Sequence, residues 1–165
     1  MPEKLYFDDD GVIPNSHRPL LLYRDVFSHT GEQAAEWLES KFSSNNWTNG
    51  WRWGVYPFHH YHSNTHEVLG VFKGSALLLL GGDNGKEVQV NAGDVIIIPA
   101  GVAHKCLSHT NGFTVVGAYP NGLKPDMRKG EAGERPQADK QIAAVPVPET
   151  DPLYGTEAGL VTIWK

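Results

Sequence analysis

The sequence predicts an all-β fold, an antiparallel sandwich or barrel, in a single domain of 165 residues. Three observations carry this prediction. After residue 50, short apolar segments follow one another and are separated by turn sequences such as Gly81–Gly85 and Asn91–Asp94. Only one earlier stretch has helical periodicity. With 40% hydrophobic and 20% charged residues, the composition is that of a globular protein long enough to bury its own core.

The elements follow in order along the chain. Residues 20–26 form the first strand-like run. A helix follows Thr30, which makes a capping box with Gln33, and it ends at residues 43–46. Its apolar residues recur at helical spacing: Ala34, Trp37, Leu38 and Phe42. Strands are then predicted at 51–60, 67–73, 75–80, 86–90, 95–98 and 113–119.

Two of these strands, residues 77–80 and 95–98, are apolar at every position instead of alternating. Such runs indicate strands covered on both faces. One face would fill the barrel, and the other needs a cover. A second sheet layer, the helix, the C-terminal tail or a partner subunit could supply it.

Beyond residue 120 the composition becomes polar. Residues 121–140 are rich in Gly, Pro and charges, which predicts a long surface loop. Residues 142–148 and 160–164 are apolar again, so we expect the tail to pack back on the barrel. The domain then comprises an N-terminal strand and helix (1–50), the barrel (51–120) and a C-terminal extension (121–165).

Charge and composition exclude several classes of function. Nineteen acidic residues against fourteen basic ones give a net charge of -5, without a basic run that could bind nucleic acid. No apolar run is long enough to span a membrane, and the N-terminus does not resemble a signal peptide. The single cysteine, Cys106, excludes an intrachain disulfide. We therefore expect a cytoplasmic protein with no nucleic-acid or membrane partner.

Two histidine clusters carry the chemistry. His60 and His62 are two residues apart, so in a strand both imidazoles point to the same side. After a turn at residues 63–65, Glu67 could supply a carboxylate, and His104 could supply a third imidazole. Divalent transition metals such as Fe, Mn, Ni, Co, Cu and Zn accept this mixture of donors, which leaves coordination positions free for water, substrate or dioxygen.

These residues resemble the two sequence motifs of the cupin superfamily. His60, His62, Glu67 and Gly74 follow the spacing of the first motif, and Gly93, Pro99, Gly101 and His104 follow that of the second. The resemblance implies a jelly-roll barrel, a double-stranded β-helix, with His60, His62, Glu67 and His104 as ligands of one divalent metal. The second motif usually ends in Asn where this chain has Ser108, but that Asn is not a ligand in the family.

The resemblance extends to single-domain bacterial cupins of the YjlB type through residues 59–63, 66–71, 116–120, 145–148 and 151–152. That group has no assigned activity. The donor set therefore indicates a metal-dependent enzyme, an oxygenase or an isomerase or lyase, acting on a small polar or anionic molecule. The alternative is a cupin that binds or stores a small molecule without catalysis. Cupins of one domain commonly pair, so a homodimer is expected.

The sequence leaves the roles of several residues near the expected ligands open. His59 and His66 each stand next to an expected ligand, so in a strand their side chains would have the opposite parity and point to the other face. This favours a surface role or one that supports the ligands. His66 could replace a ligand only if the turn distorts. Cys106 shares parity with His104 and could face the interior as a soft ligand or nucleophile, although a small buried hydrophobe is the simpler interpretation.

Three further residues share parity with His60 and could line the cavity: Arg52, Tyr56 and Phe58. An inward Arg52 would suit a carboxylate or phosphate on the substrate. Pro57 lies between these residues and favours a bulge, which could reverse the parity.

Overall fold

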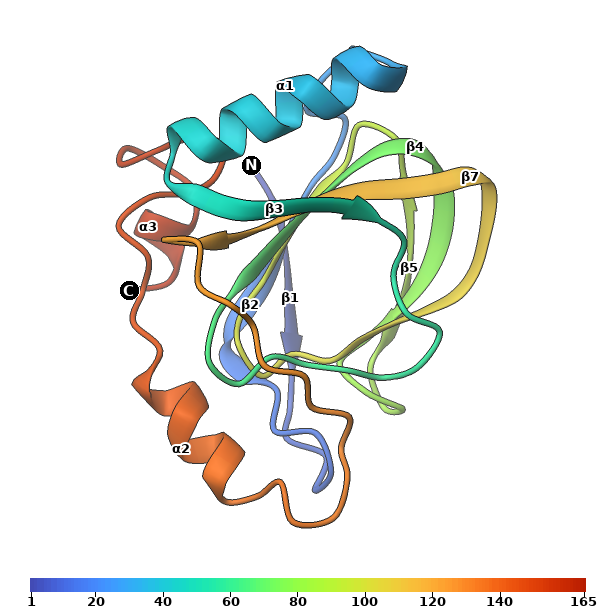
Figure 1. Ribbon diagram of the computed structural model, residues 1–165. Coiled ribbons are helices and arrows are strands. Elements are labelled where there is room, and N and C mark those ends of the chain that lie inside the picture. Colours follow the sequence, from blue (N-terminus) through green and yellow to red (C-terminus); the bar gives the residue numbers. More distant parts are fainter.

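Two long strands form the centre of the barrel in the computed structural model, which describes residues 1–165 (Figure 1). These strands, β4 (Glu67–Leu80) and β7 (His104–Pro120), pair antiparallel along most of their length. Their register shifts three times, once on each side of Lys73 and once between Leu77 and Leu78. Such bulges increase the local bend and twist, which allows both strands to curl around the barrel.

The other strands extend this pair into one antiparallel sheet in the order β1-β2-β6-β4-β7-β3. β5 pairs with residues 75–80 of β4, beyond the part of β4 that pairs with β6. They are β1 (Glu3–Phe7), β2 (Ser16–Tyr23), β3 (Trp47–Trp53), β5 (Lys86–Asn91) and β6 (Val95–Ile98). The strands curl around one another to form the barrel (Figure 1).

Alternation along the central strands divides the apolar side chains between two cores. In β6, Ile96 and Ile98 point into the barrel, whereas Val95 and Ile97 join a second core on its outer face. This explains why the strand is apolar at every position. Residues 77–80 behave differently: Leu78 and Leu80 are buried in the barrel, but Leu77 and Leu79 remain half-exposed.

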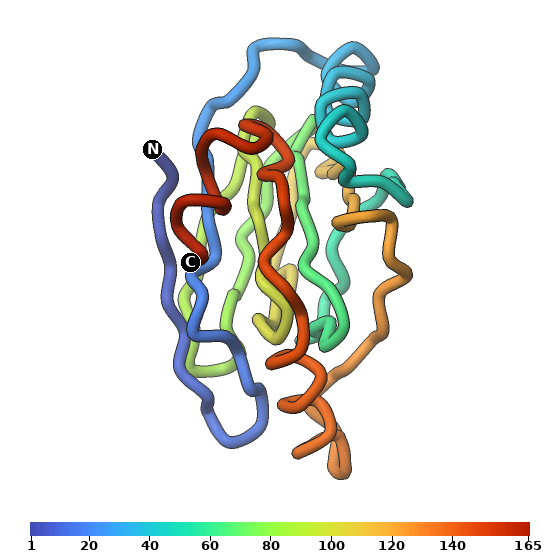
Figure 2. Tube along the Cα trace, turned by 90° about the vertical axis from the view of Figure 1, so that its left-hand side faces the viewer, coloured from blue at the N-terminus to red at the C-terminus, as the bar shows by residue number.

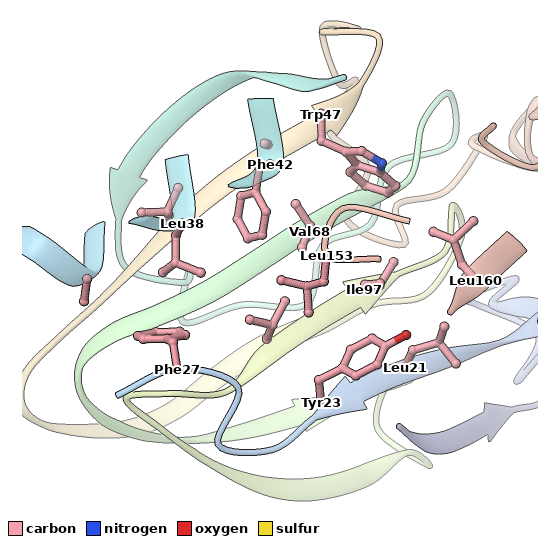
Figure 3. Packing of buried hydrophobic residues seen from close by; sticks show 14 of the residues in the cluster. Leu21, Tyr23, Phe27, Leu38, Phe42, Trp47, Val68, Ile97, Leu153 and Leu160 are labelled. Carbon is pink, nitrogen blue, oxygen red and sulfur yellow. The ribbon is translucent and has the colours of Figure 1, made fainter. Parts of the chain in front are cut away.

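Helix α1 (Gly31–Ser44) covers part of the outer core. Leu38 and Phe42 point from the helix toward Val68 of β4 and Ile97 of β6 (Figure 3). Close packing depends on Gly70, because a Cβ there would lie 2.7 Å from a Leu38 methyl group. The outer face is therefore covered by the chain itself.

The C-terminal tail covers the rest of that face (Figure 2). It contains two short helices, α2 (Gln137–Ala144) and α3 (Leu160–Ile163). Trp164 is buried, and its indole N–H donates to the carbonyl of Pro19 at 2.8 Å. The fully buried Asp151 carboxylate accepts from the backbone N–H groups of Leu153 and Leu160 at 2.8 and 2.9 Å. The Tyr23 hydroxyl of β2 also donates to the Asp151 carboxylate at 3.1 Å, so this bond and the Trp164 bond hold the tail against β2.

The structure corrects several predicted elements. β1, α2 and α3 were not predicted, and 67–80 is one continuous strand instead of two. Thr30 is the N-cap of α1, but its side chain makes no capping hydrogen bond. The strand predicted at 51–60 begins at Trp47 and ends at Trp53, before Pro57, which cannot donate to a strand ladder. The division at residue 50 thus falls inside β3.

The expectation of a homodimer loses one of its grounds. Strands with two apolar faces suggested a partner subunit, but α1 and the tail cover most of that surface. Dimerisation stays a prediction. No helix in the structure combines the length and apolar character needed to cross a bilayer.

Candidate metal centre

Backbone pairing brings the two histidine clusters together. His60 and His104 form an antiparallel bridge in which each backbone N–H donates to the other residue's carbonyl, at 3.3 and 3.0 Å. The N–H of Gly101 donates to the His62 carbonyl at 2.8 Å, and Glu67 begins β4 opposite Ile98. Residues forty positions apart in the chain therefore share one end of the barrel.

Three side chains converge on one point. Donor atoms of His62, Glu67 and His104 all lie within 4.8 Å of one another, and all three residues are buried. Glu67 Oε1 is 3.2 Å from His104 Nε2 and 3.5 Å from His62 Nε2. A metal with bonds of about 2.1 Å holds adjacent ligand atoms roughly 3–4 Å apart. The spacing therefore suits one ion.

His60 lies beside this group of three. Its ring centroid is 4.0 Å from that of His104 and 6.1 Å from that of His62. Its imidazole lines the same cavity as the other three side chains. The structure thus brings together three of the four expected ligands, with the fourth adjacent to them.

The three imidazoles share one tautomer. Nδ1 of each donates to a backbone carbonyl: His60 to Phe58 at 3.1 Å, His62 to Asp126 at 2.5 Å, and His104 to Val102 at 3.2 Å. A carbonyl can only accept, so Nδ1 carries the proton and Nε2 keeps its lone pair. Such bonds orient histidines for metal coordination.

The electrostatics also suit a cation. Burial alone would raise the pKa of Glu67, but His62 and His104 outweigh it and hold the pKa well below its ordinary value. Burial opposes charge on His62 as well, yet the Glu67 carboxylate raises its pKa. Burial, and then the neighbouring His104, lowers the pKa of His60 to about 3. An ionised carboxylate thus faces a neutral His60.

One buried nitrogen tests whether the site fits a metal. His104 Nε2 is inaccessible to solvent and makes no hydrogen bond, although Glu67 Oε1 lies 3.2 Å away. A buried polar atom without a partner is unfavourable by about 1–3 kcal/mol. Coordination to an ion would satisfy this lone pair, so the residues present fit a metal.

Tyr119 is a functional candidate that sequence reasoning missed. Burial and the nearby Glu67 carboxylate raise its pKa, so the hydroxyl keeps its proton and can donate to Glu67. The same hydroxyl accepts the indole N–H of Trp51 at 2.8 Å. Gly117 leaves the space for that indole, because a Cβ there would lie 2.3 Å from the ring. We therefore expect Tyr119 to position Glu67.

Replacing Tyr119 with Phe should weaken metal binding about 10-fold while the fold persists, since removal of groups that orient ligands typically costs 10–100-fold in affinity. Competition with a chromophoric chelator would measure the affinity, and thermal unfolding would report the fold. Tyr61→Phe is the control, because that buried tyrosine donates to Glu134 instead. Equal metal affinities for Tyr119→Phe and the wild type would contradict this role.

The polar segment after residue 120 also builds the site, which composition alone did not predict. Asp126 accepts the His62 Nδ1–H through its carbonyl, and its carboxylate accepts the N–H of Ser63 at 2.7 Å. The Asn64 side chain also binds this segment: its oxygen accepts the Asp126 N–H at 2.9 Å, and its amide N–H donates to the Lys124 carbonyl at 2.9 Å. The segment predicted as a surface loop is therefore one wall of the metal cavity.

The cavity above the histidines has a volume of about 280 Å³. Its remaining walls come from the end of β3 and the residues after it, from β7 and from the 125–127 segment: Trp51, Trp53, Gly54, Val55, Tyr56, Leu69, Tyr119, Pro125, Asp126 and Met127. The expectation that Tyr56 faces the cavity agrees with this lining.

Two other expected lining residues point elsewhere. Arg52 lies on the outer face of β3, where its guanidinium pairs with Glu32 at 2.8 Å and Glu39 at 2.7 Å on α1. The alternation of side chains cannot be extended from His60 back to Arg52, because the strand ends at Trp53 and the chain leaves it at Gly54. Cys106 packs in the barrel core and lines a separate depression with Arg52, away from the metal site. Burial raises the pKa of its thiol.

Phe58 supports His60 through its carbonyl, whereas the side chains of His59 and His66 contact the surroundings of the candidate ligands. The Phe58 ring stacks on Tyr56 with centroids 4.8 Å apart, outside the cavity lining. His59 Nε2 lies 2.8 Å from Asp83 in the β4–β5 turn. His66 Nε2 donates to the Pro146 carbonyl at 3.0 Å and its Nδ1 accepts the Ala100 N–H at 2.9 Å, so it ties the tail to the second motif.

Fold and site together define a class: a small antiparallel β-barrel with a buried histidine–carboxylate centre. A family model for cupins matches residues 52–123. The uncharacterized protein YjlB of Bacillus subtilis (strain 168) is 43% identical over 160 residues, which cover 96% of this chain and 94% of that protein. The chain belongs to the cupin family and is a YjlB-like, all-β jelly-roll cupin.

Solved structures with similar folds are more distant. Acireductone dioxygenase from Bacillus anthracis with a cadmium ion has a TM-score of 0.42 and 15% identity, covering 65% of this chain and 82% of that one. Procruciferin, an 11S globulin from Brassica napus, has a TM-score of 0.39 and 22% identity, covering 50% of this chain. This chain spans only 21% of that globulin. Neither likeness bears on the activity.

Proposed function

We propose that this chain is a metal-dependent cupin enzyme that acts on a small molecule in the 280 Å³ cavity. The observation that carries the proposal is the convergence of His62, Glu67 and His104, with an orphaned His104 nitrogen in a buried setting. A purely structural cluster would satisfy that nitrogen within the protein.

The residues divide into ligands and supports. His60, His62, Glu67 and His104 would hold one divalent transition metal. When bound, such an ion supplies Lewis acidity, or dioxygen chemistry if it is iron. The Asp126 carbonyl orients His62, and Tyr119 orients Glu67. Trp53 and Met127, with 60% and 45% of their surface exposed, lie at the open side of the cavity and admit the substrate.

Elemental analysis of protein purified without added metal or chelator tests the proposal first. We expect close to one transition-metal ion per chain. Assays of dioxygen uptake and of isomer or elimination products, against a panel of small molecules, then test catalysis. Iron with dioxygen uptake supports an oxygenase, and zinc, nickel or manganese with turnover of another kind supports an isomerase or lyase.

The competing function predicts a different result. A binding or storage cupin would contain a retained organic molecule, visible by mass spectrometry, and show no turnover with any metal. Protein that binds no transition metal, even when the metal is supplied, would contradict the proposed metal centre.

A further inference from the structure

Aromatic rings form a continuous row from the opening of the cavity to the metal ligands. Trp53 meets Tyr56 edge to face, with centroids 5.3 Å apart and planes at 82°. Tyr56 in turn meets His60 in the same way, at 5.2 Å and 83°. Across the cavity, Tyr119 lies edge-on to His62 at 6.1 Å. A molecule approaching the histidines therefore passes along aromatic side chains.

The charges around the cavity do not suit an anion held away from the metal. Among the lining residues there is no Lys or Arg, and two carboxylates are present, Glu67 and Asp126. Arg52 is held by Glu32 and Glu39, and Arg128 lies 3.5 Å from Asp126, which it neutralises. A phosphate or carboxylate outside the metal's reach would have no cationic partner, and burying it unpaired is costly.

The volume of the cavity limits the size of the molecule that it can hold. At about 30 Å³ per water molecule in the liquid, 280 Å³ holds roughly nine waters. This is near the lower end of the range for ligand pockets. The space suits a single ring with a short substituent.

We propose that the cavity takes a small monocyclic aromatic molecule that is uncharged except for the polar group reaching the metal. The ring would pack between the Trp53–Tyr56 side and Met127, where the indole, the phenol and the thioether offer favourable contacts. This inference rests on the proposed function, since it names the class of molecule for the same site. It replaces the anionic substrate that an inward Arg52 would have favoured.

Three matched probes test the proposal on the purified, metal-loaded protein by isothermal titration calorimetry. Benzyl alcohol is the aromatic probe, cyclohexylmethanol lacks the aromatic ring, and 4-(hydroxymethyl)benzenesulfonate adds at the far end a charged group that is a poor metal ligand. We expect benzyl alcohol to bind tightest. Trp53→Leu should weaken its binding about 2- to 12-fold, the range of one aromatic contact, and leave cyclohexylmethanol within about 2-fold.

Tyr6→Leu is the matched control, because Tyr6 is an equally exposed aromatic residue on β1, away from the cavity. No detectable binding of benzyl alcohol, a preference for either other probe, or equal losses in the Trp53 and Tyr6 variants would overturn the inference. The same titrations on chelator-treated protein separate the two proposals. A ring preference that persists in protein unable to bind metal would leave this inference standing while the metal-dependent enzyme fails.

Discussion

Replacing His62 with Ala is expected to abolish metal binding and, with it, the stabilisation that metal gives to the fold. A ligand present at 100 times its Kd stabilises the native state by about 2.7 kcal/mol. For a domain of this size that corresponds to a rise of roughly 5–10 °C in Tm. The wild type should show this rise between chelator-treated and metal-loaded samples, whereas His62→Ala should show none.

Companion variants assign the individual ligands. His104→Ala and Glu67→Gln should behave like His62→Ala, and the double variant His60→Ala with His62→Ala should lose all metal. His109→Ala is the control, since His109 is exposed on the same strand as His104. Elemental analysis and thermal unfolding are the two measurements. An unchanged metal content in His62→Ala would show that the ion, if any, lies elsewhere.

Replacing Trp164 with Ala is expected to reduce the free energy of unfolding by about 3–5 kcal/mol, the usual range for a buried Trp or Phe. Trp164 is 1% exposed, lies 4.8 Å from the His66 ring and donates to Pro19 of β2. Removing it opens a cavity in the outer core and releases the tail from the barrel. Urea denaturation monitored by far-ultraviolet circular dichroism would measure the loss.

One further variant separates packing from hydrogen bonding at position 164, and a second serves as a control at an exposed tryptophan. Trp164→Phe keeps most of the ring but loses the bond to the Pro19 carbonyl, and should cost about 1–3 kcal/mol. Trp53→Ala removes an indole that is 60% exposed, so the expected cost is below about 1 kcal/mol. If Trp164→Ala were as stable as the wild type, the tail would contribute nothing to the folded core.

Local patterns in the sequence were enough to predict the fold class and to select four candidate ligands, whose role in binding a metal stays a prediction. His60 and His62 share parity, and the structure places Glu67 and His104 at the same end of the barrel. These candidates could be selected because the spacing of side chains within a strand or turn is a short-range property of the backbone. Strand periodicity likewise identified most of the sheet, although it missed β1, a strand of five residues that begins with two charged ones.

Predictions for the cavity walls were less successful. Parity placed Arg52 inside, but the strand ends at Trp53 and the next residues around Pro57 are irregular, so Arg52 lies outside with α1. Cys106 shares parity with His104 but lies beyond the metal site, in the barrel core. Parity holds only while a strand continues.

By itself, the sequence determined the all-β class and the four candidate ligands, because these depend on periodicity and spacing within short segments. Only the tertiary structure decided what covers the outer face of the barrel, what orients the ligands and what lines the cavity. Tyr119, Asp126 and Trp164 reach their partners from distant parts of the chain. Their roles follow from how the sheet curls and where the tail returns, which no local pattern encodes.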